Sequence, residues 1–238
     1  MSSAITTVLV HGAFADASSW GPVTERLLAG GHRVVVPPVF NRSLSADAAY
    51  IKSFVEQIDG PVLLCGHSYG GAVITVAGVA DNVVGLVFVS GYVLENGESL
   101  GQLQGGFPDS DLAASLVYAP YPVDGGEPGT DVSVEVAAFP EVFAAGLDKT
   151  RAQVLAVSQR PLSAAAFGEP ATATAWRTKP GWGIVSSADR TINPDVERFG
   201  YQRAALRSVV ELDAPHLVMQ THPDEVAAVI TEALAALA

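Results

Sequence analysis

The pentapeptide Gly66-His67-Ser68-Tyr69-Gly70 constrains the fold more than any other stretch of this sequence. The apolar run of residues 61–65 precedes it, and residues 71–77, which follow, can start a helix. A G-x-S-x-G sequence in that setting predicts a sharp strand-to-helix turn that carries the serine hydroxyl out of the fold. Such a turn strains the serine backbone and brings neighbouring backbone close. It therefore requires small residues on both sides.

The rest of the first ninety residues alternates expected strands with expected helices. Residues 5–10, 33–36 and 83–89 form β-branched or apolar runs, and apolar side chains recur with the period of a helix over residues 51–58. Apolar strands without alternation, separated by helices, indicate a parallel sheet covered on both faces. We therefore predict an α/β fold with a mostly parallel central sheet of about six strands flanked by helices.

The regular alternation stops between residues 91 and 180, where Gly, Pro, Ala and acidic residues dominate. A structureless loop of that length is rare inside a compact domain, so we predict an inserted cap of short helices. The alternation then returns with two expected strands, the helix between them and a final helix. The predicted organisation is a core domain of residues 1–90 and 181–238 with a cap, or lid, subdomain of residues 91–180.

Composition narrows the classes of function. The chain has 238 residues, of which 25 are acidic and 13 basic, and its formal net charge is −12. Nucleic acids and anionic membranes attract clusters of Lys and Arg, which this sequence lacks, so neither is expected as a partner. Cys65 is the only cysteine, so no intrachain disulfide can form. We see no secretory signal and no apolar run long enough to span a membrane, so cytoplasmic residence is expected.

A serine hydroxyl is a weak nucleophile unless a base takes its proton, and the base is usually a histidine oriented by a carboxylate. In an open parallel sheet the reacting groups gather beyond the carboxyl ends of the strands. His216 follows the expected strand of residues 208–212, on a loop before the last helix, and is the predicted base for Ser68. The remaining four histidines fit structural roles better: His11, His32, His67 and His222.

The carboxylate that would orient His216 has several candidates. Asp189 comes just after an expected strand and is the predicted acid, although an aspartate there can also cap a turn. Glu95 follows another strand and is the rival. Asp213 is too close in sequence to His216 to orient it easily. Asp195 falls in the first turn of a helix, where an acid favours the helix dipole without any catalytic role.

Acyl transfer at a serine also needs backbone N–H groups aimed at the position where negative charge develops. The residue after the nucleophile, Tyr69, is placed to supply one, assisted by the N-terminus of its helix. The loop after the first strand is placed to supply the other. Ala13 is the predicted donor there, and its neighbour Phe14 is the alternative.

The order serine, acid, histidine, together with Val8-Leu9-Val10-His11-Gly12-Ala13 and Ser18-Ser19-Trp20, resembles the α/β-hydrolase fold superfamily. The similar branch contains plant methylesterases, salicylate-binding esterases, hydroxynitrile lyases and many bacterial esterases. The resemblance covers nearly the whole chain and implies a cap over the substrate pocket, with no metal and no organic cofactor. It places the catalytic residues at Ser68, Asp189 and His216 and the oxyanion amides at Ala13 and Tyr69.

Two positions depart from the hydroxynitrile lyases of that branch. Those enzymes have a threonine just after the first-strand histidine and a lysine just after the catalytic histidine. Here the two positions are Gly12 and Leu217. Without the lysine nothing obvious holds a leaving cyanide, so lyase activity is not expected.

The function that we expect is that of a serine esterase, which cleaves a carboxylic ester through an acyl-enzyme. A largely apolar cap with few cations favours a small, neutral, fairly hydrophobic ester as the small-molecule partner. The alternatives are a lactonase, perhydrolase or lyase without a cofactor on the same scaffold, or a small-molecule-binding protein with little turnover. A homodimer is compatible with the sequence, which leaves the oligomeric state open.

Overall fold

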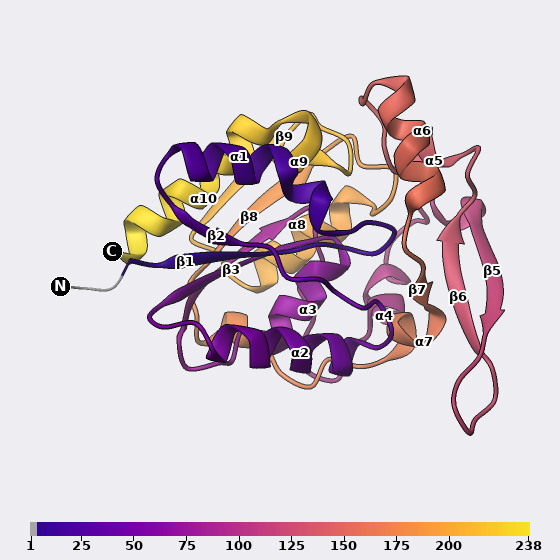
Figure 1. Cartoon of the computed structure of the whole chain (residues 1–238), viewed down its shortest axis with the longest axis horizontal. Helices are drawn as coiled ribbons and strands as arrows, with labels where there is room; N and C mark the ends of the chain where they lie inside the picture. The colour runs from indigo at the N-terminus through magenta and orange to yellow at the C-terminus, as the bar shows by residue number, and fades with distance from the viewer. Residues whose placement is uncertain (1–3) are drawn as a thin grey trace.

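The computed structural model describes residues 4–238 and contains a six-stranded parallel sheet in the order β2-β1-β3-β4-β8-β9 (Figure 1). Every strand of this sheet runs parallel to its neighbours. The fold class predicted from the alternation of strands and helices is thereby confirmed. The strands are β1 (Thr6–Val10), β2 (Arg33–Val35), β3 (Val62–His67), β4 (Val83–Val89), β8 (Gly181–Ser186) and β9 (Ser208–Leu212).

Helices cover both faces of the sheet. On one face α1 (Gly21–Ala29) packs against α10 (Pro223–Leu237), and on the other α2 (Leu44–Glu56) packs against α3 (Tyr69–Ala77) (Figure 1). The central strands are buried from end to end, because helices remove both of their faces from water. Three further elements complete the core: η1 (Ala17–Trp20), α8 (Pro194–Arg203) and α9 (Val218–Thr221). No helix within residues 4–238 combines the length and the apolar character that crossing a membrane requires.

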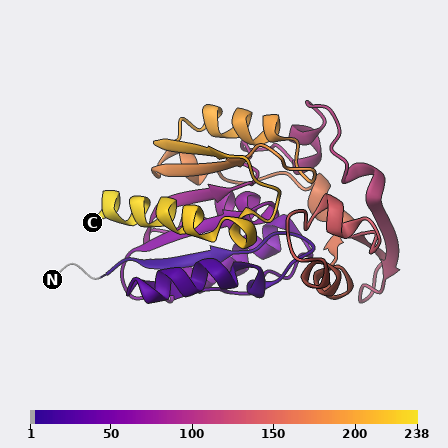
Figure 2. The ribbon, with the colours of Figure 1, turned by 90° about the horizontal axis from the view of Figure 1, so that it is seen from above.

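Residues 91–180 leave the sheet after β4 and return to it at β8. In both views most of them lie at the end of the sheet opposite to the C-terminal end of α10 (Figures 1 and 2). They contain short helices and a three-stranded antiparallel sheet in the order β5-β6-β7. The elements are α4 (Leu100–Gln104), η2 (Ala113–Ser115), β5 (Leu116–Tyr121), β6 (Gly129–Val134), α5 (Phe139–Val142), α6 (Lys149–Ser158), β7 (Leu162–Ser163), α7 (Ala164–Gly168) and η3 (Ala175–Arg177).

The sequence prediction of a purely helical insertion missed this small sheet. In β6 the side chains of Val132 and Val134 are buried while those between and before them are partly exposed, which is the two-residue period of a strand. That period is short and lies among Gly, Pro and acidic residues. The division into a core domain and a cap subdomain stays a prediction, and its residues 1–3 lie outside the described residues.

Candidate active site

Ser68 occupies the sharp turn between β3 and α3. Its backbone has φ 55° and ψ −123°, a left-handed conformation that is strained for a residue with a side chain. The flanking glycines allow that turn. A Cβ on Gly66 would overlap the carbonyl of Gly70, and a Cβ on Gly70 would lie 2.5 Å from the carbonyl oxygen of Val10. The requirement for small flanking residues thus has a physical basis in the packing.

His216 and Asp189 meet beyond the carboxyl ends of β9 and β8. The Nδ1 atom of His216 donates to Oδ2 of Asp189 at 2.5 Å, and both side chains are fully buried. The second oxygen of Asp189 accepts from the backbone N–H groups of Thr191 at 2.6 Å and Ile192 at 3.0 Å. These bonds hold the carboxylate in one orientation toward the ring. The Nε2 atom of His216 is buried and has no hydrogen-bond partner among the described residues.

The rival carboxylates lie elsewhere. Glu95 forms an ion pair with Arg177 near the surface, and its Oε1 also accepts from the backbone N–H of Asn96. Asp195 pairs with Arg198 on the exposed side of α8, and Asp213 is exposed. Of the candidate acids that the sequence offered, the structure brings only Asp189 to His216.

The two candidate donors in the loop after β1 differ in their hydrogen bonding. The backbone N–H of Phe14 donates to the carbonyl oxygen of Arg160 at 3.0 Å, so this amide is already engaged. Ala13 and Tyr69 both line a cavity at Ser68. Tyr69 is the first residue of α3, where a backbone N–H has no acceptor within its own helix. The arrangement therefore favours Ala13 over Phe14 as the partner of Tyr69.

Gly12 is packed directly against Ser68. A Cβ at Gly12 would lie 2.7 Å from the Cβ of Ser68 and 3.0 Å from the carbonyl oxygen of His67. A threonine at this position, as in the hydroxynitrile lyases that the sequence resembles, would not fit without moving the turn.

His67 has a structural connection that sequence reasoning missed. Its Nε2 atom donates to the backbone carbonyl oxygen of His216 at 3.0 Å, and the two ring centroids lie 4.6 Å apart. Burial lowers the pKa of His67 well below its usual value, and the neighbouring His216 lowers it further. His67 is therefore neutral and links the turn at Ser68 to the loop that carries His216. No local sequence pattern marks such a contact.

Glu197 on α8 is a second residue that sequence reasoning missed. Its Oε2 accepts from the backbone N–H of Ser186 at 3.0 Å, and the side chain is fully buried. Burial, together with the negative charge of the nearby Asp189, raises the pKa of Glu197 well above its usual value. Burial beside Asp189 therefore favours the protonated form of Glu197.

The cavity at Ser68 is small, with a volume of about 10 Å³. Most of its lining is apolar or aromatic: Ala13, Phe14, Ser68, Tyr69, Tyr92, Leu100, Leu112, Leu162, Phe167, Thr191 and Ile192. Within residues 4–238 there is no group of three or more His, Cys, Asp or Glu side chains arranged to hold a metal ion.

Residues 7–229 match the profile of the Alpha/beta hydrolase family. One curated relative is a carbendazim hydrolyzing esterase from Nocardioides sp. (strain SG-4G), which is 36% identical over 109 residues. That match covers 39% of this chain and 44% of the relative. It therefore spans less than half the length of that protein.

Solved structures share the fold over nearly the whole chain. Polyneuridine aldehyde esterase superimposes with a TM-score of 0.83 at 17% identity, covering 97% of this chain and 99% of that one. A pyrethroid hydrolase from Sphingobium faniae JZ-2 has a TM-score of 0.75 at 20% identity, covering 98% of both chains. A methylesterase from Arabidopsis has a TM-score of 0.81 at 17% identity, covering 98% of this chain and 100% of that one.

Proposed function

Because the chain belongs to the Alpha/beta hydrolase family, we propose that it is a serine esterase that hydrolyses a small, neutral, fairly hydrophobic carboxylic ester. The observations that carry the proposal are the buried pair of His216 and Asp189 and the strained turn at Ser68. His67, the residue before Ser68, joins the two through its hydrogen bond to the backbone carbonyl oxygen of His216.

The reaction proceeds by two acyl transfers. Nε2 of His216 takes the proton of Ser68 as Oγ attacks the ester carbonyl carbon, and the backbone amides of Ala13 and Tyr69 stabilise the oxyanion. The ester C–O bond then breaks, and His216 gives its proton to the departing alcohol oxygen. Water, deprotonated by the same ring, attacks the acyl-enzyme and releases the carboxylic acid. Asp189 stabilises the imidazolium that forms in each half-reaction.

The lining of the cavity at Ser68 supports a neutral substrate. Lys and Arg side chains are absent from it, and Leu100, Leu162 and Phe167 contribute much of its wall. The names of the similar proteins also point to esters, since they include three esterases and a pyrethroid hydrolase. The close contact between Gly12 and Ser68, together with the apolar Leu217, argues against the lyase alternative.

The test uses purified protein, ethyl acetate as substrate and a fluorophosphonate probe of activated serines. Wild type is expected to release acetic acid and to be labelled at Ser68. Ser68→Ala is expected to lose both signals while its circular dichroism spectrum and melting temperature stay near those of wild type. Turnover in Ser68→Ala equal to that of wild type would refute the mechanism. A wild type that is neither labelled nor active on short esters would favour the small-molecule-binding alternative.

A further inference from the structure

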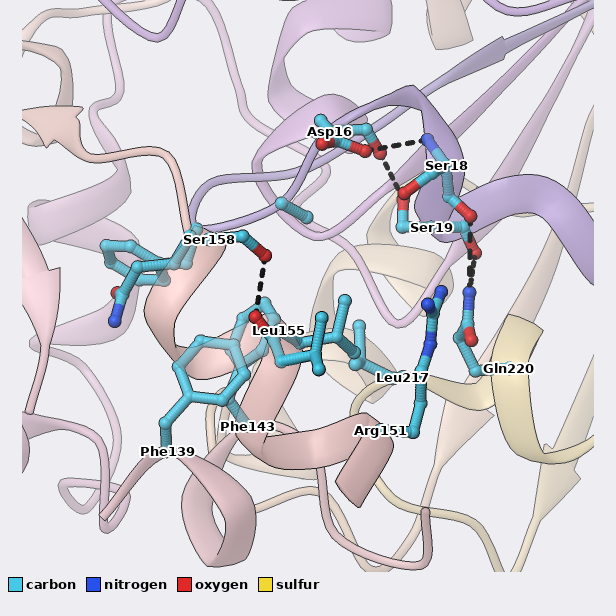
Figure 3. A pocket seen from close by; sticks show the side chains of 14 residues that line it. Asp16, Ser18, Ser19, Phe139, Phe143, Arg151, Leu155, Ser158, Leu217 and Gln220 are labelled. Carbon is cyan, nitrogen blue, oxygen red and sulfur yellow. Dashed lines mark hydrogen bonds between the residues drawn. The ribbon is translucent and has the colours of Figure 1, made fainter. Parts of the chain in front are cut away.

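Two larger cavities flank the small cavity at Ser68. The first, which we call the α6 cavity, has a volume of about 160 Å³ and lies between α5, α6, α9 and the chain around η1 (Figure 3). The second, the β5 cavity, has a volume of about 310 Å³ and is lined by residues of β5, β6 and α7. The space at Ser68 is about what one water molecule needs, so it cannot by itself hold both halves of an ester.

The cavity at Ser68 shares lining residues with each of the two larger cavities. Phe14 lines both the cavity at Ser68 and the α6 cavity, and no other residue lines both. Leu112 and Phe167 line both the cavity at Ser68 and the β5 cavity. The cavity at Ser68 therefore has a neighbouring cavity on each side, and Phe14 is the residue that it shares with the α6 cavity.

The α6 cavity lies on the His216 side of the site. Leu217, which lines it, follows His216 in the chain, and Phe143, which also lines it, has its ring centroid 5.0 Å from that of His216. His216 gives its proton to the departing alcohol oxygen in the proposed mechanism. The alcohol half of the ester must therefore leave on this side.

Both the ring and the backbone of Phe14 are held in place by their neighbours. The side chain is 3% exposed, its ring packs edge-on against Phe143 at 5.8 Å, and its backbone N–H is bonded to the carbonyl oxygen of Arg160. Behind the ring, Phe139, Phe143 and Leu155 give the α6 cavity an apolar side, as Figure 3 shows. The rest of the lining is largely polar and includes Asp16, Arg151 and Gln220, so an aromatic group in this cavity would pack against the apolar side.

We propose that Phe14 determines specificity for the alcohol half of the substrate. Its ring closes the α6 cavity to Ser68 and so restricts the enzyme to esters of small alcohols. Removing the ring joins the two spaces and admits an aromatic alcohol. This inference rests on the proposed esterase function and adds to it the chemical class of the leaving group.

The test compares ethyl, benzyl and 2-naphthylmethyl acetates, which share one acyl group and release alcohols of similar acidity. Wild type is expected to prefer the ethyl over the 2-naphthylmethyl ester in kcat/KM. Phe14→Ala is expected to shift that ratio toward the 2-naphthylmethyl ester by about tenfold or more, whatever the change in the absolute rate on ethyl acetate. Phe14→Leu, a smaller change in a tightly packed position, is expected to shift it in the same direction by a lesser factor.

The matched control is Phe167→Ala, which removes an equal ring from the opposite wall. It is expected to leave the ratio among alcohols near that of wild type. The proposal is overturned if both Phe14 variants hydrolyse ethyl acetate with an unchanged ratio, or if Phe167→Ala shifts the ratio as much as Phe14→Ala does. If the proposed esterase function is itself wrong, wild type will hydrolyse none of the three esters. That result is distinct from an unchanged ratio, and it would overturn this inference as well.

Discussion

The Nε2 atom of His67 donates a hydrogen bond to the backbone carbonyl oxygen of His216 at 3.0 Å. The two residues are far apart in the sequence: His67 is the last residue of β3, and His216 lies in the loop that follows β9. Because a carbonyl oxygen can only accept, the proton of His67 is on Nε2. His67, which is next to Ser68 in the chain, thereby holds the backbone of His216 in place.

Replacing His67 tests that link. His67→Ala leaves the carbonyl of His216 unpaired and lets its loop shift, and we expect kcat/KM for ethyl acetate to fall by about 10–100-fold. The loss should exceed any loss for His222→Ala, since the ring of His222 bonds to the side chain of its neighbour Thr221 and not to the loop of His216. Steady-state kinetics of the two variants, with melting temperatures as a check on folding, decide the matter. Equal kinetics in the two variants would remove His67 from the positioning of His216.

The assignment of Asp189 over Glu95 can be tested by matched amide substitutions. Asp189→Asn removes the charge that faces His216 and favours the wrong tautomer of the ring, so we expect kcat to fall by about 10³–10⁴-fold. Glu95→Gln weakens a surface pair with Arg177 and keeps an oxygen that can accept from the backbone N–H of Asn96, so kcat should change by less than about threefold. Single-substrate kinetics at neutral pH measure both. A larger loss in Glu95→Gln than in Asp189→Asn would reverse the assignment.

The close approach of Gly12 to Ser68 predicts that an alanine at position 12 lowers both stability and activity. Gly12→Ala places a methyl group 2.7 Å from the Cβ of Ser68, and we expect it to cost about 1–3 kcal/mol of unfolding free energy and most of the activity. Gly21→Ala is the control, because a Cβ there meets nothing within 4 Å and lies in a helix. It should change stability by less than about 1 kcal/mol. Urea denaturation of both variants provides the comparison, and equal costs would contradict the packing argument.

The raised pKa of Glu197 predicts that the stability of the protein depends on pH. Its pKa in the folded protein is raised above the unfolded value, mainly by burial and then by the charge of Asp189. Below the unfolded pKa both states hold the proton and nothing is lost. As the pH rises above that value the unfolded state releases the proton and the folded state keeps it, so stability falls.

Glu197→Gln removes this dependence while keeping an acceptor for the backbone N–H of Ser186. We expect the variant to gain stability relative to wild type as the pH rises from 4 to 8. Urea denaturation at several pH values measures the difference. The groups that also face Glu197 are Asp189, Arg198, Tyr92 and Tyr201, and they are unchanged in the variant. A difference that stays constant with pH would show that Glu197 ionises in the folded protein.

The sequence by itself determined the parallel sheet, the turn at Ser68 and the family, and these predictions are confirmed. Local patterns were sufficient there, because apolar runs and a Gly-Ser-Gly turn act over a few neighbouring residues. The same reasoning missed β6, whose two-residue period is short, and β5, whose residues are all exposed or half-buried and show no such period.

Only the tertiary structure decided how distant side chains meet. It placed Asp189, and not Glu95, in contact with His216. It paired the backbone N–H of Phe14 with the carbonyl oxygen of Arg160. It also brought His67 to the backbone of His216 and Glu197 to that of Ser186. Each of these contacts depends on the directions in which side chains and backbone groups of distant segments point. Periodicity along the chain carries no information about those directions, whereas packing fixes them.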